Sequence, residues 1–204
     1  MAGLKTTTEG MALVTGLVFA KASRPQASVL FSEVAIIGTR DGQPTFEFRM
    51  GNARGNDVVE ATVRLTVLRT ETTAEGHTMR KLHDMVLVRE RSPIFAMSWT
   101  VMHVIDENSP LHGCSREHLD EQDVWFIVTM TGWDLTYANT VHSRKLYQMQ
   151  DIRTGVKFVD VMSRQDDGRM RIDFRYFHDV EPLVDDGSQP PVTPEGLQET
   201  PSKA

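Results

Sequence analysis

The chain has 204 residues, 40% of them hydrophobic, which is enough for one globular domain with its own core. Its 28 acidic residues against 22 basic ones give a formal net charge of −6, and this balance argues against a nucleic-acid-binding surface. A single cysteine, Cys114, excludes an internal disulfide bond and favours a reducing compartment.

The first candidate element is an apolar run from Gly10 to Ala20, closed by Lys21 and Arg24. The residues alone leave three interpretations open. A secretory signal fits the length of the run and the A-x-A pattern Ala20-Lys21-Ala22, although the lysine within that pattern opposes it. A complete membrane-spanning helix needs about 20 apolar residues, and this run supplies roughly half of them. The third interpretation is the end of a longer membrane helix with a positive flank.

From Ser28 to Leu183, apolar residues alternate with polar ones, which is the period of β-strands. The alternation is clearest in the segments 45–50 (TFEFRM), 58–69 (VVEATVRLTVLR) and 123–131 (DVWFIVTMT). In the last segment, Trp125 and Ile127 make the second face apolar too. We expect that strand to be covered on both sides or to meet a partner subunit.

Turn signals divide this region at Asp41-Gly42, Gly51-Asn52, Glu75-Gly76, Ser109-Pro110 and Asp167-Gly168. About nine short strands with little helix predict an all-β fold, an immunoglobulin-like β-sandwich. The helix expected within it is SREHLDEQ (115–122), with Ser115 as its N-cap. From Val184 onward, Pro, Gly, Ser and acidic residues dominate, so residues 184–204 are expected to form a disordered tail.

A set of motifs follows in a fixed order after the GLVFAKASRP segment: R-D-G (40–42), R-x-G-N-x-R (49–54), V-V-E-A (58–61), HVIDENSPL (103–111) and S-R-x-x-Y (143–147). In order and spacing they resemble the inward-rectifier potassium channels, most of all the prokaryotic branch, over roughly Gly10 to Pro182. The resemblance implies that residues 1–25 are the end of a pore-lining inner helix and its linker. Residues 26–183 would then be the cytoplasmic β-sandwich domain.

The family implies a homotetramer at the cytoplasmic face of the inner membrane, whose domains enclose an aqueous vestibule that continues the membrane pore. Its function would be to couple lipid or ligand binding to the pore gate, with potassium as the permeant ion and no cofactor. The chain contains no T-x-G-Y-G selectivity filter, so we do not expect it to conduct selectively by itself.

The resemblance assigns roles to four residues near the start of the chain. Phe19 corresponds to a bulky ring that gates the pore by dewetting, and a lipid- or helix-facing phenylalanine is the plainer alternative. Gly16 lies one turn earlier, where it would either permit bending or allow close helix packing. Lys21 and Arg24 correspond to positions that bind anionic lipid head groups. Simple positive-inside anchoring is the alternative role for these two basic residues.

Further roles fall on two later segments. Glu75 corresponds to an acidic residue that lines the vestibule and attracts polyamines or magnesium; a water-exposed turn glutamate is the plainer alternative. The second vestibule glutamate of the family corresponds to Leu135, and Asp134 beside it is expected to supply part of the missing charge. The narrowest girdle corresponds to Thr136, Tyr137, Ala138, Asn139, Thr140 and Val141, where small residues let four copies approach the axis.

The residues give weaker support for metal binding or catalysis. His112, Cys114 and His118 have the residue types of a metal site but no fourth ligand nearby, so no metal site is predicted. His83-Asp84 has the residue types of a base and its orienting carboxylate. The chain has no nucleophile motif such as G-x-S-x-G, and we expect no enzymatic activity. The rival function is a stand-alone immunoglobulin-like module that binds a partner protein or lipid.

Overall fold

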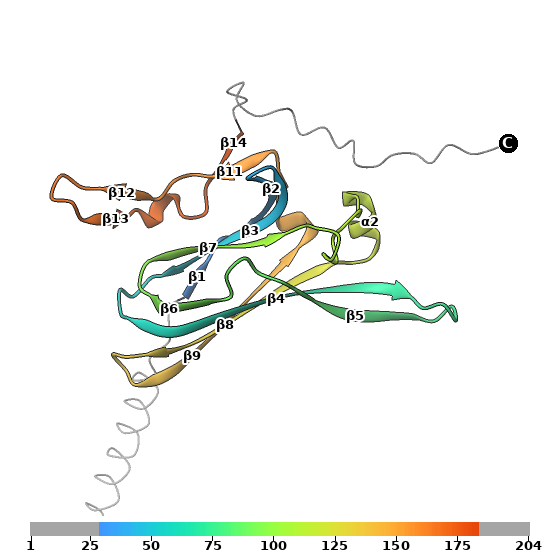
Figure 1. The fold of residues 1–204 in the computed structure, drawn as a ribbon, viewed down its shortest axis with the longest axis horizontal. Helices are drawn as coiled ribbons and strands as arrows, with labels where there is room; N and C mark the ends of the chain where they lie inside the picture. Colours follow the sequence, from blue (N-terminus) through green and yellow to red (C-terminus); the bar gives the residue numbers. More distant parts are fainter. Residues whose placement is uncertain (1–28, 184–204) are drawn as a thin grey trace, which may run out of the picture.

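A computed structural model of the protein describes residues 29–183. Most of these residues lie in strands, which form two main sheets packed against each other around a common core (Figure 1). The predicted all-β sandwich is therefore confirmed. The expected helical stub and the expected tail lie outside the described residues.

The first sheet is organised by β3 (Gln43–Asn52). One edge of β3 pairs with β1 (Val29–Phe31) and β2 (Ala35–Arg40), and the other edge pairs with β7 (Ser98–Val104), all antiparallel. β10 (Ile152–Thr154) extends the sheet by pairing in parallel with β2.

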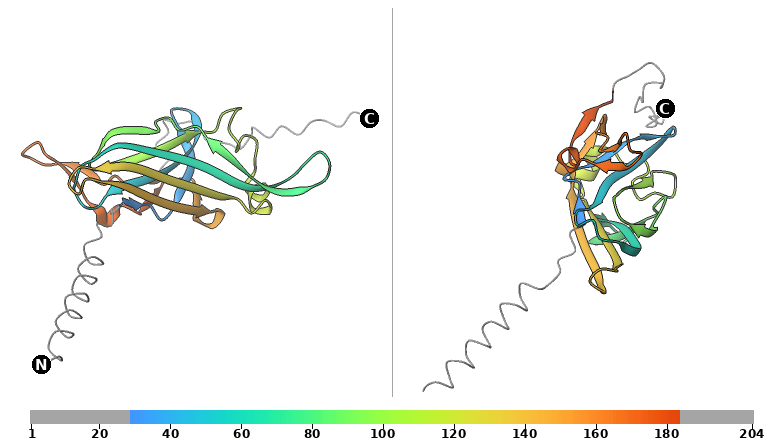
Figure 2. Two further views of the ribbon diagram at one scale, coloured as in Figure 1. Left: turned by 90° about the horizontal axis from the view of Figure 1, so that it is seen from below. Right: turned by 90° about the vertical axis from the view of Figure 1, so that its left-hand side faces the viewer.

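The second sheet is organised by β4 (Val58–Thr72), a strand of 15 residues. One edge of β4 pairs with β8 (Trp125–Asp134), which in turn pairs with β9 (Asn139–Gln148). The other edge pairs first with β6 (Arg91–Phe95) and then with β5 (Thr78–Met85). The β4–β5 hairpin extends beyond the sandwich at one end (Figure 2).

The core lies between these two sheets and follows the alternation seen in the sequence. Its centre is formed by Phe46, Phe48 and Met50 of β3, Val63, Leu65 and Val67 of β4, and Phe126, Val128 and Met130 of β8. The Phe46 and Phe126 rings stack across the sheets with centroids 4.6 Å apart. Tyr147 is fully buried, and its hydroxyl donates a hydrogen bond to the Ser32 carbonyl oxygen at 2.9 Å.

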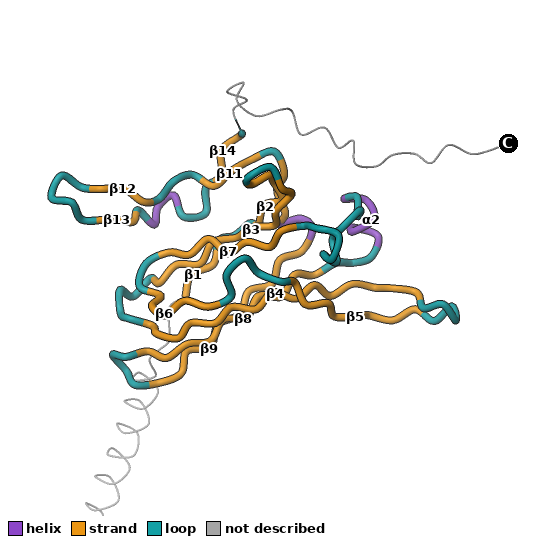
Figure 3. The backbone as a smooth tube through the Cα atoms, viewed as in Figure 1, coloured by secondary structure: helices purple, strands orange, loops and turns teal. Residues whose placement is uncertain are grey.

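The remaining elements are short. The helix α2 (Arg116–Glu121) confirms the predicted helix, because the Ser115 hydroxyl accepts a hydrogen bond from the His118 N–H at 3.2 Å. After β9, 3-10 turns lie at Met149–Asp151 and Phe174–Tyr176. β11 (Val156–Phe158) pairs with β14 (Val180–Pro182), and β12 (Met162–Arg164) pairs with β13 (Met170–Ile172). The β12–β13 hairpin projects at the end opposite to the β4–β5 hairpin (Figure 3).

Two details differ from the sequence prediction. Residues 29–183 contain fourteen strands, because six have only three residues and are too short to show alternation. Gly51 and Asn52 belong to β3 and pair with β1, and the turn follows at Ala53 and Arg54. Gly51 is instead a point of close approach, since a Cβ there would lie 2.9 Å from the Phe174 ring. The other four turn signals fall between elements.

Gly132 gives a test of the pairing between β8 and β4. It lies opposite a bulge in β4 at which Glu60 has a φ of 51°, and a Cβ would lie 2.6 Å from Val58 Cγ1. We expect Gly132→Ala to lower the free energy of unfolding by about 1–3 kcal/mol, measured by urea denaturation. The control Gly38→Ala, whose Cβ has its nearest neighbour at 3.7 Å, should cost less than about 0.5 kcal/mol. Equal losses would contradict this account.

Candidate functional site

Four predicted site residues lie outside the described residues: Gly16 and Phe19 of the gate, and Lys21 and Arg24 of the lipid contact. Their roles stay predictions. The others, Glu75 and the segment from Asp134 to Val141, belong to two hairpins of the second sheet.

The segment predicted to form the girdle is a tight turn followed by a strand. Leu135, Thr136, Tyr137 and Ala138 form the turn, whereas residues 139–141 begin β9. Ala138 has a φ of 49°, in the left-handed region that favours glycine. The turn is therefore shorter and more constrained than a six-residue loop.

The Asp134 side chain ends β8 and is only 1% exposed. Its Oδ1 accepts hydrogen bonds from the backbone N–H groups of Thr136 (2.9 Å) and Tyr137 (3.2 Å), and its Oδ2 accepts one from Asn56 Nδ2. Burial alone would raise the pKa of Asp134, but the hydrogen bonds from Asn56 and the two backbone groups together hold it below its ordinary value. The carboxylate is therefore ionised and fully engaged within the protein.

The Asp134 carboxylate therefore does not lie at the surface of the domain, and its expected contribution of charge to a water-filled vestibule stays a prediction. The inward orientation follows from strand alternation, because Val128, Met130 and Asp134 share the core-facing phase of β8. The neighbouring Leu135 is the exposed residue, at 56%. In this structure the Asp134 carboxylate holds the β8–β9 turn.

The turn between β3 and β4 lies against the β8–β9 turn. Asn52 Nδ2 donates hydrogen bonds to the carbonyl oxygens of Asn56 and Phe95, and Asn52 Oδ1 accepts one from the Arg54 N–H at 3.2 Å. The Arg54 guanidinium lies 5.5 Å from the centroid of the Tyr137 ring. Part of the R-x-G-N-x-R motif therefore connects the two turns.

Asn56 is a functional candidate that the sequence analysis missed. A single asparagine in a polar turn carries no distinctive signal, so only its contact with Asp134 identifies it. The buried position of Asp134, by contrast, was available from the alternation of β8.

Glu75 lies at the exposed tip of the β4–β5 hairpin. The Thr73 hydroxyl, and then the backbone N–H of Glu75 itself, lower the pKa of this carboxyl, so it is ionised at neutral pH. No ion pair involves Glu75 among residues 29–183. Strand β4 separates Glu75 from the β8–β9 turn by roughly 50 Å, at about 3.3 Å per residue. The two predicted parts of the vestibule thus lie at opposite ends of one sheet.

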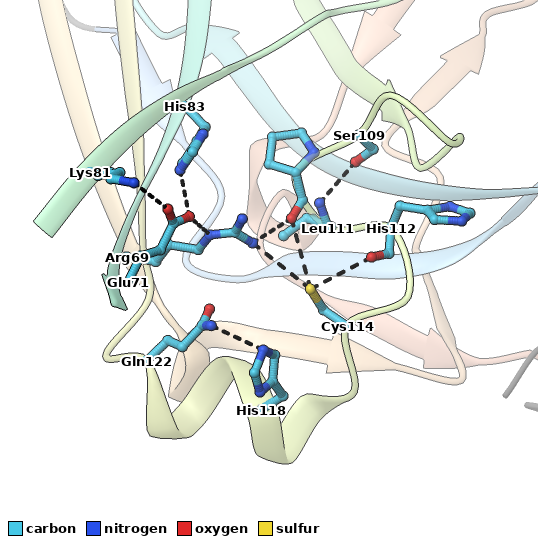
Figure 4. Close-up of polar contacts among 11 residues, drawn as sticks. Arg69, Glu71, Lys81, His83, Ser109, Leu111, His112, Cys114, His118 and Gln122 are labelled. Atoms are coloured by element: carbon cyan, nitrogen blue, oxygen red, sulfur yellow. Dashed lines mark hydrogen bonds and ion pairs between the residues drawn. The ribbon is translucent and has the colours of Figure 1, made fainter. Parts of the chain in front are cut away.

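An ion-pair cluster supports the base of that hairpin (Figure 4). Glu71 contacts Arg69 Nε at 2.6 Å, Lys81 Nζ at 3.3 Å and His83 Nε2 at 2.7 Å. The hydrogen bond from Arg69, joined by those from Lys81 and His83, lowers the pKa of Glu71 to about 2. His83 therefore pairs with Glu71 across the hairpin and not with Asp84, which accepts a hydrogen bond from the Thr66 hydroxyl at 3.0 Å.

The metal-like trio of the sequence analysis lies near this cluster (Figure 4). Cys114 Sγ lies 3.8 Å from Arg69 Nη1, and His118 Nε2 lies 3.0 Å from the Gln122 amide nitrogen. Within the part of the chain that the structure describes, no three His, Cys, Asp or Glu side chains are grouped to hold a metal ion.

The outer face of the second sheet, which is directed away from the first sheet, carries uncovered apolar side chains. Ile94, Val59 and Trp133 occupy neighbouring register positions on β6, β4 and β8, and Ile94 is 59% and Trp133 44% exposed. Farther along, half-buried Ile127 lies beside Leu146, which is 36% exposed. The predicted second apolar face of β8 is therefore present and partly open to solvent.

Comparison with known proteins matches residues 29–190 to the family described as the inward rectifier potassium channel C-terminal domain. The inward rectifier potassium channel Kirbac3.1 of Paramagnetospirillum magnetotacticum is 41% identical over 171 residues. The chain belongs to the inward rectifier potassium channel family. Human ATP-sensitive inward rectifier potassium channel 12 is a more distant relative, 32% identical over 170 residues.

These matches cover 84% and 80% of this chain but only 58% and 39% of the two relatives. The relatives are named as ion channels, in agreement with the prediction that the chain is not an enzyme. Among solved structures, Spo0M, a sporulation control protein from Bacillus subtilis, covers 63% of this chain and 49% of its own. Its 7% identity and TM-score of 0.30 support no conclusion. None of the helices between residues 29 and 183 has the length and apolar character needed to cross a bilayer.

The Glu71 cluster predicts a loss of stability in acid. The folded-state pKa of about 2 lies below the ordinary value of 4.5, so the ionised carboxyl stabilises the fold above about pH 4.5. That contribution disappears as the pH falls towards 2. We expect Glu71→Gln to flatten the decline of urea midpoints over this range. Glu121→Gln, an exposed control on α2, should leave the decline unchanged. A wild-type slope in Glu71→Gln would contradict the assignment.

Proposed function

We propose that this chain is the cytoplasmic part of an inward-rectifier potassium channel, in which four copies enclose an ion conduit at the cytoplasmic face of the inner membrane. Family membership carries the proposal, through the match over residues 29–190 and the 41% identity to a named channel. The open apolar face around Ile94 and Trp133 supports assembly, because an exposed patch of this kind is commonly covered by another subunit.

Within such a conduit, the two hairpins of the second sheet have different roles. The segment from Thr136 to Val141, which contains most of the β8–β9 turn, forms the narrow girdle, for which the small Ala138 in that turn is suited. The Glu75 carboxylates of four copies, ionised and outside every ion pair among residues 29–183, raise the local concentration of cations such as polyamines or magnesium.

The gate and lipid contact belong to the same proposal. Lys21 and Arg24 bind anionic lipid beneath the membrane, and the linker from Lys21 to Leu30 transmits this binding to the gate at Phe19 and Gly16. The linker enters the sandwich through β1, whose first residue, Val29, pairs with Asn52 at the end of β3. Movement of the linker would therefore act first on that end of the first sheet.

Replacing Trp133 with a charged residue tests whether the chain assembles through the outer face of the second sheet. We expect light scattering to detect a tetramer of the 204-residue chain at high concentration, and Trp133→Glu to raise the concentration needed at least about tenfold. Met170→Glu is a matched control, because Met170 is 46% exposed but lies on the β12–β13 hairpin. A chain that stays monomeric at every concentration would instead favour a stand-alone binding module.

The vestibule charge is tested by substituting Glu75. We expect Glu75→Gln to weaken the binding of spermine and of magnesium to the assembled chain by about three- to tenfold at low salt, with a smaller difference at high salt. Isothermal titration calorimetry measures both ligands. Glu121→Gln removes the same charge from α2 and should have little effect. Equal effects of the two substitutions would contradict a local role for Glu75.

A further inference from the structure

We propose that Asn56 and Asp134 are positioning residues, which fix the place of the β8–β9 turn at the axis of the conduit. This inference rests on the proposed function, because the turn narrows a conduit only when four copies meet. In this proposal Asp134 acts by fixing the position of the β8–β9 turn and not by attracting cations.

The two oxygens of the Asp134 carboxylate have different hydrogen-bond partners. Oδ1 accepts both N–H groups at the start of the turn, those of Thr136 and Tyr137, and Oδ2 accepts the Asn56 amide. One oxygen thus holds the turn while the other ties it to a different loop. An ionised carboxylate can only accept hydrogen bonds, so Asn56 must present its NH₂ group to Asp134.

Asn56 is also attached to the first sheet. Its backbone carbonyl oxygen accepts a hydrogen bond from the Asn52 side-chain amide. The same Asn52 side chain donates to the Phe95 carbonyl oxygen and accepts from the Arg54 N–H. Asn52 pairs with Val29, where the chain enters the sandwich. The turn is therefore positioned relative to the strand that continues the linker.

Burial makes these hydrogen bonds costly to lose. Asp134 is 1% and Asn52 5% exposed, and Asn56 is half-buried, so removing one partner leaves the buried Asp134 or Asn52 group with little access to water. The exposed stacking of Arg54 on Tyr137 adds a second contact between the same two turns. Loss of the Asn56–Asp134 bond should release the turn without unfolding the sheet that bears it.

The identities of donor and acceptor give a sharp test. Asp134→Asn keeps an oxygen for Thr136 and Tyr137 but turns a second NH₂ group towards Asn56. Asn56→Asp places two carboxylates face to face. The double variant Asn56→Asp/Asp134→Asn exchanges donor and acceptor and restores the bond. Asn56→Ala removes the donor without adding charge, and it replaces any single variant that does not fold.

Two measurements follow the turn in the 204-residue chain. Hydrogen exchange of the Thr136 and Tyr137 amides reports their hydrogen bonds to Asp134. We expect the exchange rates to rise about tenfold in each single variant and to return to the parent values in the double variant. Double electron–electron resonance, with a spin label at Leu135→Cys in a Cys114→Ser background, reports the turn in the assembly. In a fourfold assembly the four spin labels lie at the corners of a square. The parent chain should therefore give two narrow distance distributions, one for the side of that square and one for its diagonal.

The outcomes separate the two proposals. The positioning role is supported if both distance distributions are broader in the single variants than in the parent and become narrow again in the double variant. Narrow distances in every variant overturn the positioning role and leave the conduit standing. Broadening that the double variant does not reverse also overturns it, because the donor–acceptor account then fails. A parent without the paired distances overturns the proposed function, and the positioning role with it.

Discussion

The length of β4 and its pairing on both edges form the constraint on which the rest of the structure depends. The strand pairs with β8 on one edge and with β6 and then β5 on the other, so it is held along most of its 15 residues. The β8–β9 turn and the β4–β5 hairpin are consequently fixed roughly 50 Å apart, at about 3.3 Å per residue. Each end can be specialised without disturbing the other.

The two ends are stabilised by different physics. At the hairpin, Glu71 is held by three cationic or hydrogen-bonding partners that remain partly open to solvent, where salt screens their attraction. At the turn, Asp134 is buried and accepts three hydrogen bonds, so screening is weak and an unpaired group is costly. The hairpin is thus sensitive to pH and ionic strength, whereas the turn is sensitive to the geometry of its neighbours.

The sequence was sufficient to predict which side chains face the core, but not which polar side chains contact one another. Alternation gave the core-facing residues of β3, β4 and β8, and the same phase extended by four residues from Met130 would have placed Asp134 inside. The turn expected at Gly51-Asn52 lies two residues later because both residues pair with β1, and Gly51 instead allows Phe174 to approach closely; local turn propensity contains neither of these contacts between distant segments. Family resemblance supplied the expectation of a tetramer and of a vestibule. It did not distinguish a buried carboxylate from an exposed one, because that difference lies in the partners and not in the residue type.

This difference decides how the domain can act on cations. Glu47 is buried against Arg40, Glu71 is surrounded by Arg69, Lys81 and His83, and Asp134 is engaged by hydrogen bonds within the protein. Glu47 and Glu71 are neutralised locally and add little to the long-range field. Glu75 is exposed, ionised and outside every ion pair among residues 29–183, so no neighbouring cation in that part of the chain neutralises its charge. In the proposed conduit, the hairpin tips therefore contribute attraction for cations, and the β8–β9 turn contributes by its shape.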